Sequence, residues 1–370
     1  MEIFRPYGFD KTLFLVTLIL MVIGLVMVYS SSGILASEKY QDSFHFFVNQ
    51  LVVAGIGLAL IFFMFPIRKQ FYKNFYFIYG LLFLSFFLLV LCLLMPALAK
   101  TNRWVQFFSL RFQPSELAKI SLILFFAYYL DRKKEKMNEF QTLLFPLIVL
   151  LIFILLIIKE PDYGTALLVF LTCSIMLFIG GVKFKYFICL GIFSSALFTF
   201  YLFQASYRLD RIIAFLSPTK DPQGAGFQII QSKLAIGSGG LLGVSIGEST
   251  QKLFFLPCTH TDYIYAIVGE ELGLIGTLTV LFLFLIFLWR GLVIARNAPN
   301  FFSQIAAAGI TLAIFSQAML NISIVLGLGP PTGIPLPLIS YGRSSLLCSL
   351  FGIGILLNIS QRKKNIIRKK

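Results

Sequence analysis

The sequence predicts an all-α polytopic membrane protein with about ten transmembrane helices and a long outside loop between helices 7 and 8. Its 370 residues are 58% hydrophobic and only 13% charged, whereas about a quarter of the residues in a soluble domain are charged. Apolar runs long enough to cross about 30 Å of hydrocarbon recur along the chain. The basic residues between these runs are unevenly shared between the two sides, as in membrane proteins with a fixed orientation.

The ten predicted spans are separated by short polar connections, apart from the long one after the seventh span. The first run is about 20 residues long, which exceeds the apolar core of a typical signal peptide, and a second span follows soon after it. We therefore expect an uncleaved first helix. The spans are 12–30, 46–65, 75–95, 114–130, 141–158, 164–181, 184–205, 262–289, 302–328 and 342–360.

The basic residues predict the orientation of the chain in a cytoplasmic (inner) membrane. If both termini are cytoplasmic, nineteen Lys and Arg residues fall in the inside segments and ten in the outside ones. Such an excess on one side marks the cytoplasmic face. The net charge of +15 is then explained by attraction to anionic lipid of the inner leaflet, and a nucleic acid partner is not required.

The whole chain, 1–370, reads as a single transmembrane domain with no separate soluble domain. Its long outside loop, about 206–261, contains "GSGGLLGVSIG", which is too rich in glycine for a continuous helix. A loop of this length is usually functional when it is ordered, and a disordered tether is the alternative. We interpret "GSGG" as flexible backbone. The proline-rich stretch 329–342 predicts a rigid re-entrant or surface loop.

Several chemistries are disfavoured by what the sequence lacks. Only Cys258 lies in the long outside loop, so no outside disulfide within the chain is expected. There are two histidines and neither an HExxH nor a CxxC motif, which argues against a dedicated zinc site. Ser344 and Ser345 have no nearby His or Lys at the spacing of a catalytic triad.

Ionisable residues within or beside predicted spans are candidates for function, because they are costly in a bilayer. Glu116 and Lys119 are spaced i, i+3, so they can pair on one helix face, and a purely structural pair is the alternative. Asp162 sits between two spans, where it can cap the next helix or contribute to a site. Glu270 and Glu271 lie about 12 to 14 Å along a helix from Asp262 and cannot face lipid as bare anions.

A second group of charges lies on the outside face, where the positive-inside rule disfavours cations. Arg103, Trp104 and Arg111 lie in one outside segment, and Arg208 and Arg211 in the long loop. Arginine binds phosphate through its bidentate fork, so these residues with Asp262 predict a site for a phosphate-bearing lipid. Interfacial anchoring by Trp104 and chance loop charges are the alternative, and Asp262 could simply cap its helix.

Six stretches in chain order resemble signatures of the SEDS family (shape, elongation, division, sporulation), the peptidoglycan polymerases typified by FtsW and RodA. The family resemblance covers nearly the whole chain, and "DPQGAG" and "ARNAPN" are closer to the division-type FtsW branch. The six stretches are "GLVMVYSSS", "RWVQFFSLRFQPSELAK", "EPDYGTA", "RIIAFLSPTKDPQGAGFQIIQSKLAIGSGG", "LPCTHTDYIYAIVGEELGLIG" and "TGIPLPLISYG".

The resemblance implies a ten-helix glycosyltransferase that polymerises lipid II on the outer face of the membrane. Lipid II is an undecaprenyl-pyrophosphate-linked disaccharide peptide, and the implied partners are a class B penicillin-binding transpeptidase and other divisome proteins. Asp262 matches the essential aspartate of the family and would act as the general base. Arg103, Arg111, Arg208, Arg211 and Lys233 are candidates for binding pyrophosphate, and a divalent cation (Mg or Mn) shared by carboxylate and substrate is possible. His260 and Ser340 lie in matching motifs and complete the expected substrate site, although a lone histidine is often structural.

The chain departs from the family pattern in two motifs. Cys258 and Thr259 occupy positions where members usually have Glu and Ala, which removes an acid four residues before Asp262, and Arg343 replaces a glycine. We expect Glu270 and Glu271 to pair with buried cations, and we take Lys119 and Arg343 as their partners. The rival functions are a lipid II flippase or transporter, an elongation-type RodA polymerase and a scaffold of the division machinery.

Overall fold

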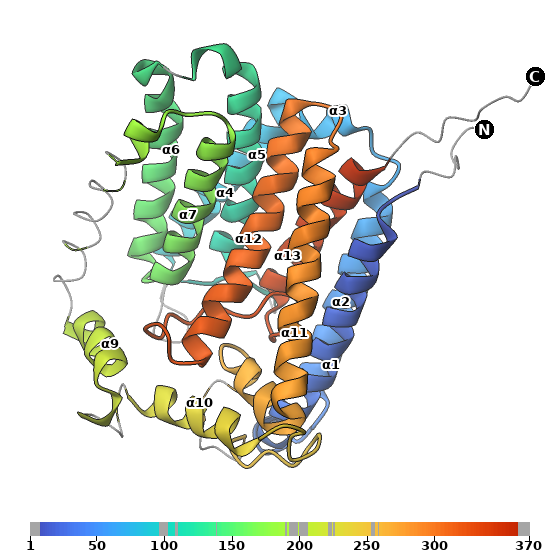
Figure 1. The fold of residues 1–370 in the computed structure, drawn as a ribbon, viewed down its shortest axis with the longest axis vertical. Helices are drawn as coiled ribbons and strands as arrows, with labels where there is room; N and C mark the ends of the chain where they lie inside the picture. Colours follow the sequence, from blue (N-terminus) through green and yellow to red (C-terminus); the bar gives the residue numbers. More distant parts are fainter. Residues whose placement is uncertain are drawn as a thin grey trace, which may run out of the picture.

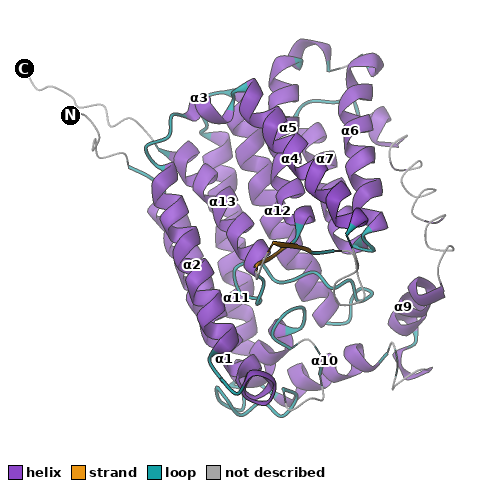
Figure 2. Ribbon diagram, turned by 180° about the vertical axis from the view of Figure 1, so that it is seen from behind, coloured by secondary structure: helices purple, strands orange, loops and turns teal. Residues whose placement is uncertain are grey.

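A computed structural model describes residues 8–95, 103–107, 110–137, 139–188, 191, 199, 206–220, 224, 226–252, 256–257 and 259–361. It is nearly all helical, as predicted (Figures 1 and 2). The first helices are α1 (Lys11–Tyr40), α2 (His45–Met64), α3 (Lys69–Tyr72), α4 (Phe75–Leu94), α5 (Pro114–Arg132), the 3₁₀ turn η1 (Lys134–Lys136), α6 (Phe140–Lys159) and α7 (Tyr163–Ile179). They are followed by α9 (Ser206–Leu216), the 3₁₀ turn η2 (Pro218–Lys220), α10 (Phe227–Ser238), α11 (Ile264–Arg296), α12 (Phe301–Val325) and α13 (Arg343–Ser360).

Nine of the ten predicted spans correspond to helices, and the seventh, 184–205, lies mostly outside the described residues. Seven described helices are long and apolar enough to cross a membrane: α1, α2, α4, α6, α11, α12 and α13. Helix α7 is a shorter apolar helix of 17 residues, and α5 carries two acidic and two basic residues. The chain is a multi-pass membrane protein.

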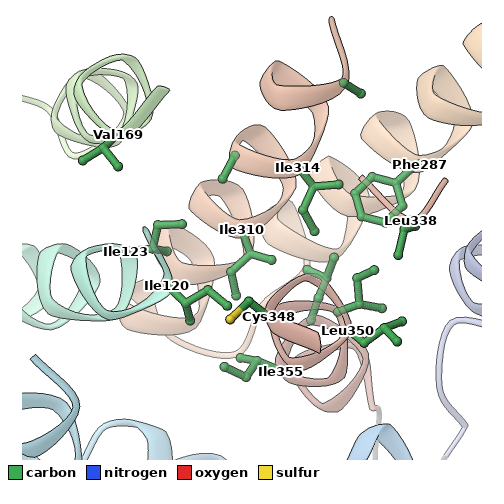
Figure 3. Close-up of a cluster of buried hydrophobic side chains, with 14 of the residues drawn as sticks. Ile120, Ile123, Val169, Phe287, Ile310, Ile314, Leu338, Cys348, Leu350 and Ile355 are labelled. Atoms are coloured by element: carbon green, nitrogen blue, oxygen red, sulfur yellow. The ribbon is translucent and has the colours of Figure 1, made fainter. Parts of the chain in front are cut away.

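The core of the bundle is formed where α12 lies among α5, α7, α11 and α13. Most of α12 and α13 is buried, whereas only 22% of an apolar 18-residue stretch of α4 is buried, as expected for a helix at the lipid boundary. Figure 3 shows Ile310 and Ile314 of α12 among side chains of α5 and α13, including Ile120 and Cys348. Helices α12 and α13 come from the second half of the chain, and α5 from the first half is also buried along most of its length.

The two ends of the bundle differ in structure. Helix α1 begins and α13 ends beside α3, where the backbone N–H of Asp10 donates to Ser360 Oγ at 3.0 Å. The Lys69 ammonium donates to the carbonyl of Ile359 at 2.7 Å and that of Gln361 at 2.9 Å, so it satisfies the C-terminus of α13. Helices α9 and α10 lie at the opposite end (Figures 1 and 2). The long loop and the terminal helix ends are thus on opposite sides of the bundle.

Helix α11 is not the single continuous helix that the sequence predicts. Gly273 has φ 65° and ψ −160°, which interrupts the helix after Glu271 and Leu272. The segment 239–245 closes the break: Val244 N–H donates to the Glu270 carbonyl at 3.0 Å, and Leu274 N–H donates to the Gly240 carbonyl at 2.9 Å. Segment 239–245 thereby supplies hydrogen bonds that a continuous helix would make within itself.

The "GSGG" stretch is therefore packed, and its interpretation as flexible backbone is wrong. A Cβ on Gly239 would lie 2.0 Å from the Gly269 carbonyl oxygen, and one on Gly243 would lie 2.1 Å from that of Glu271. Both distances are far below a van der Waals contact. The glycines at these two positions let the loop backbone reach the kink in α11.

The proline-rich stretch 329–342 is a buried re-entrant segment before α13, in line with one of the two predicted forms. Leu336, Leu338 and Ile339 are each at most 2% exposed. The segment lies directly against α1, because a Cβ added to Gly24 would be 2.5 Å from the Leu338 carbonyl oxygen and 2.7 Å from Ile339 Cα. Gly24 in the first span thus sets the depth at which the re-entrant segment sits.

We expect Gly24→Ala to destabilise the protein by about 1 to 3 kcal/mol, because the added methyl group overlaps backbone that cannot rotate away. Gly55→Ala on α2 is the matched control, since a Cβ there meets nothing within 4 Å and alanine favours the helix. Thermal unfolding of the detergent-solubilised variants measures the effect. Equal stability of both variants would contradict the close approach at Gly24.

Candidate active site

Asp262 lies immediately before α11, at the end of the bundle that carries α10. The helix begins at Ile264 and its N-cap residue is Tyr263, with no side-chain cap, so Asp262 does not cap α11 and that alternative is wrong. The backbone carbonyl of Asp262 accepts a hydrogen bond from Asn321 Nδ2 at 2.7 Å. Among the described residues, no hydrogen-bond donor occupies the Asp262 carboxylate. Its position is fixed through the backbone, and its acid group is left available.

The carboxylate of Asp262 lies next to the re-entrant segment and close to Arg103. A Cβ placed on Gly333 would be 3.4 Å from Asp262 Oδ2 and 3.8 Å from Arg103 Nη1. Burial raises the pKa of Asp262 to about 6; the positive charges of Arg103 and Arg211 oppose the increase, and the Asp162 carboxylate adds to it. Asp262 is therefore ionised at neutral pH with a pKa suited to a general base.

Arg103 is held by backbone carbonyls, which leaves part of its guanidinium free. Its Nε donates to the Glu160 carbonyl at 3.2 Å and its Nη2 donates to the Pro161 carbonyl. The Glu160 side chain is fully buried, and burial, reinforced by the neighbouring Asp162 carboxylate, raises the pKa of Glu160 to about 9. A neutral Glu160 leaves the charge of Arg103 available to an anion, with Nη1 on the side of Asp262.

Asp162 caps α7, the predicted structural role for this residue. Its Oδ1 accepts from the Thr165 N–H at 3.2 Å, and its Oδ2 accepts from Thr165 Oγ1 at 2.9 Å and Gln113 Nε2 at 3.0 Å. These bonds tie the start of α7 to the start of α5. The negative charge of Asp162 helps to raise the pKa of Asp262. Both carboxylate oxygens of Asp162 already accept hydrogen bonds.

The remaining cations of the predicted substrate site differ in how close they lie to Asp262. Arg211 in α9 donates from Nη1 to the Pro331 carbonyl at 3.1 Å, and its positive charge lowers the pKa of Asp262.

The other predicted substrate residues have different surroundings. Arg111 is exposed on β2 (Leu110–Phe112), which pairs antiparallel with β1 (Val105–Phe107). Trp104, next to Arg103, is half-buried. Lys233 in α10 lies against Gly327 at the end of α12, where a Cβ would be 2.8 Å from its Nζ. The side chain of Arg208 lies outside the described residues.

His260 and Ser340 make contacts that hold the re-entrant segment against the stretch before α11. The His260 ring lies 4.9 Å from the Phe46 ring and 5.8 Å from that of Tyr341. Burial, with a smaller contribution from Lys39, lowers the pKa of His260 to about 4, so the ring is neutral at pH 7. Ser340 Oγ donates to the Thr261 carbonyl at 2.5 Å and accepts from Leu336 N–H at 2.8 Å. Both residues join the re-entrant segment to the stretch before α11, and a substrate contact for either stays a prediction.

The partners expected for Glu270 and Glu271 were wrong. Glu271 pairs with Lys252, whose Nζ lies 3.0 Å from Oε1 in a buried site, and Ser30 Oγ donates to the same carboxylate at 2.6 Å. Glu270 accepts from Thr250 N–H at 2.9 Å and from Ser249 Oγ. Both acids lie on α11 and bond to residues of the long loop, so they hold the loop against the helix. The partner of Glu271 comes from the loop because the kink at Gly273 turns this part of α11 towards the loop.

The predicted partners have other contacts. Lys119 Nζ lies 2.9 Å from Glu116 Oε2, which is the i, i+3 pair expected on α5, and it also donates to Gln317 Oε1 at 2.5 Å. Arg343 is the first residue of α13, and within the described part of the chain it forms no ion pair with either glutamate. Among the described residues, Arg343 is thus not the counter-charge of Glu270 or Glu271.

Two residues of α12 contribute to the site and were missed by sequence reasoning. Asn321 Nδ2 donates to the Ile334 carbonyl at 2.7 Å as well as to that of Asp262, and Gln317 Nε2 donates to the Pro335 carbonyl at 3.0 Å. Their spacing of four places both amides on one helix face. These two buried amides, four residues apart in a helix apolar enough to cross a membrane, are the signal that could have identified them.

We expect Asn321→Leu to slow the glycosyl transfer that the family resemblance implies, because it leaves the buried Ile334 carbonyl and the partly buried Asp262 carbonyl without this donor and releases the backbone of Asp262. An unsatisfied buried group costs about 1 to 3 kcal/mol. Asn49→Leu is the control, since Asn49 donates only to the His45 carbonyl within α2. Turnover at saturating substrate, measured beside thermal stability, checks the prediction. Equal turnover in the two variants would show that Asn321 does not position Asp262.

The sequence matches a known protein family over nearly its full length. The family model described as cell cycle protein, which covers FtsW, RodA and SpoVE, matches residues 10–365. The chain is similar to stage V sporulation protein E of Bacillus subtilis (strain 168), with 41% identity over 357 residues that cover 95% of this chain and 97% of that protein. It is also similar to the probable peptidoglycan glycosyltransferase FtsW of Geobacter sulfurreducens (strain DL-1 / KN400), with 41% identity over 359 residues and 96% of each chain covered.

Solved structures resemble the chain over nearly its full length. One is a chain of "Structural coordination of polymerization and crosslinking by a peptidoglycan synthase complex", with a TM-score of 0.78, 27% identity and coverage of 95% of this chain and 98% of that chain. Another is the crystal structure of Thermus thermophilus rod shape determining protein RodA, with a TM-score of 0.69, 25% identity and coverage of 95% and 97%.

Proposed function

Because the chain belongs to the FtsW, RodA and SpoVE family, we propose that it is a peptidoglycan glycosyltransferase that polymerises lipid II with Asp262 as general base. The observation that carries the proposal is the Asp262 carboxylate, free of described hydrogen-bond donors and beside Arg103 and Arg211. A carboxylate with adjacent cations suits a reaction in which a hydroxyl loses a proton and a pyrophosphate leaves.

The reaction joins two sugar units. The 4-hydroxyl oxygen of the acceptor forms a bond to the anomeric carbon of the donor while its proton passes to an oxygen of Asp262. The bond from that carbon to undecaprenyl pyrophosphate breaks, and the leaving group takes the electron pair. Arg103 and Arg211 stabilise the negative charge that develops on the pyrophosphate, because their guanidinium groups are already positioned by backbone carbonyls.

A divalent cation would fit this site only if the substrate supplied ligands. No group of three or more His, Cys, Asp or Glu that could hold a metal occurs among the residues that the structure describes, and the oxygens of Asp162 are occupied by hydrogen bonds. Mg²⁺ is commonly bound through one or two carboxylates together with substrate phosphates. We therefore assign Asp262 as the one carboxylate that would hold Mg²⁺ or Mn²⁺ with the pyrophosphate, where the ion would neutralise charge.

The relatives and the charges of the chain support a proposal for its cellular setting. The FtsW relatives favour a role in division over the elongation role of RodA. Similarity to a peptidoglycan synthase complex supports a class B penicillin-binding transpeptidase as partner, with other divisome proteins. The excess of basic residues in alternate connections supports cytoplasmic termini. Asp262 then lies on the outer face of the inner membrane, where lipid II is used.

The decisive experiment separates polymerisation from transport. The purified chain with its transpeptidase partner is given labelled lipid II, and the products are resolved by size, while vesicles containing the chain are tested for movement of lipid II between leaflets. We expect glycan ladders. Lipid II that crosses the vesicle membrane without any ladder would favour the flippase. If neither ladders nor lipid movement were observed, the scaffold would be the remaining function.

A further inference from the structure

A large cavity lies at the end of the bundle that is remote from Asp262. Asp262 precedes the first residue of α11, whereas this cavity lies at the last turns of α11 and α13 and at the start of α1. Its volume is about 1080 Å³. It is bounded by the start of α1, the connection from α2 to α3, and the C-terminal ends of α11 and α13 (Figure 1). None of the residues assigned to glycosyl transfer lines it.

The polar side of this cavity is strongly basic. Lys11, Arg68, Lys69 and Arg290 line it, against a single acidic residue, Asp10. Asp10 forms an ion pair with Arg290, so three positive charges remain without a balancing carboxylate in the wall. An anion that entered the cavity would meet these charges together, at short range and partly shielded from water.

The three cations left in the cavity wall differ in their partners. Lys69 donates to carbonyls at the end of α13, and its charge also offsets the negative end of that helix, which would otherwise repel an anion. Lys11 and Arg68 are exposed and form no ion pair with the described residues. They are therefore free to bind a ligand.

The other wall of the cavity is apolar. The rings of Phe9 and Phe65 stack at a centroid distance of 5.0 Å, and with Ile67, Val293 and Ile294 they form a hydrophobic lining. A ligand that satisfies both walls has a negatively charged head and hydrocarbon beside it. Basic pockets between transmembrane helices on the cytoplasmic side bind lipid head groups of this kind.

We propose that this cavity binds the phosphate head group of an anionic phospholipid, with Lys11 and Arg68 as the main phosphate ligands. The acyl chains lie along the apolar wall. With the cytoplasmic termini proposed above, the head group belongs to the inner leaflet. A free phosphate ester shares the head-group chemistry but would gain nothing from the apolar wall. The basic character of the cavity favours an anionic ligand.

The test compares lipid binding to the full-length protein in detergent by native mass spectrometry. Phosphatidylglycerol and phosphatidylcholine are titrated against the wild type, the variant Lys11→Gln/Arg68→Gln and the control Lys183→Gln/Lys185→Gln. The control removes two exposed cations that follow α7, outside the cavity lining. We expect the wild type and the control to prefer phosphatidylglycerol, and the cavity variant to bind it about 25-fold more weakly, about fivefold for each lost cation.

Three results would overturn the proposal. Undiminished phosphatidylglycerol binding by Lys11→Gln/Arg68→Gln would place the lipid elsewhere. Equal affinity for phosphatidylcholine would show that charge does not select the ligand. Displacement of the lipid by soluble glycerol phosphate at similar concentration would show that the apolar wall contributes nothing and that the ligand is a free phosphate. Because all readouts are binding, none of them depends on the proposed polymerase activity.

Discussion

Asp262→Asn is expected to lower the rate of lipid II polymerisation by about 10²- to 10⁴-fold, the usual contribution of a general base. Asparagine has nearly the same shape but cannot accept the proton of the acceptor hydroxyl at neutral pH. The fold should survive, because Asp262 is held through its backbone carbonyl by Asn321 and its carboxylate does not cap α11. Initial rates of glycan formation, measured with equal amounts of folded protein, give the effect.

Asp262→Glu is the informative companion variant. It restores a carboxylate that is displaced by one methylene group, so its rate should lie between those of Asp262→Asn and the wild type. If Asp262→Glu were as impaired as Asp262→Asn while both bound lipid II normally, a carboxylate alone would not be sufficient and its position would be required as well. If Asp262→Asn were fully active, Asp262 would not be the base.

Lys252→Met is expected to destabilise the protein by about 3 to 5 kcal/mol, because it leaves the Glu271 carboxylate buried without its counter-charge. The pair is almost fully buried, with side-chain exposures of 5% for Lys252 and 0% for Glu271. The donor from Ser30 cannot replace a full positive charge. Thermal unfolding in detergent, with access to the buried thiol of Cys173 as a second probe, measures the loss.

Two comparisons separate the buried pair from a general effect of charge removal. Lys73→Met breaks a more exposed pair with Asp131, where Lys73 is 39% exposed, and should cost less than about 1 kcal/mol. The double variant Lys252→Met/Glu271→Leu removes both charges and should recover much of the stability lost in Lys252→Met. A double variant less stable than Lys252→Met would show that the pair is not coupled.

The fold class could be predicted from apolar length alone, because a helix that crosses the membrane must satisfy its backbone internally and expose apolar side chains. The same reasoning placed the start of α5 at Pro114 and the cap of α7 at Asp162, since both signals are local. The break in α11 was not visible, because Gly273 also occurs within an apolar run that suits a helix. What makes the break stable is segment 239–245, about thirty residues earlier.

The candidate site shows the same division between local and distant information. Asp262 and the cations Arg103 and Arg211 were selected by charge on the outside face, and the structure brings these three together. The partner of Glu271 was misassigned because Lys252 lies in a loop whose path depends on the kink. Asn321 and Gln317 escaped notice because an uncharged amide in an apolar helix is a weak signal until its carbonyl partners are known.

The assignment of Asp262 as base is tested most directly by the pH dependence of polymerisation between pH 5 and 8. A base must be ionised, and burial raises the pKa of Asp262 to about 6, so the rate should be constant above that pH and fall about tenfold per unit well below it. The fall should be absent from the residual activity of Asp262→Asn. An acid limb that persists unchanged in Asp262→Asn, or a wild-type rate that is flat to pH 5, would contradict the assignment.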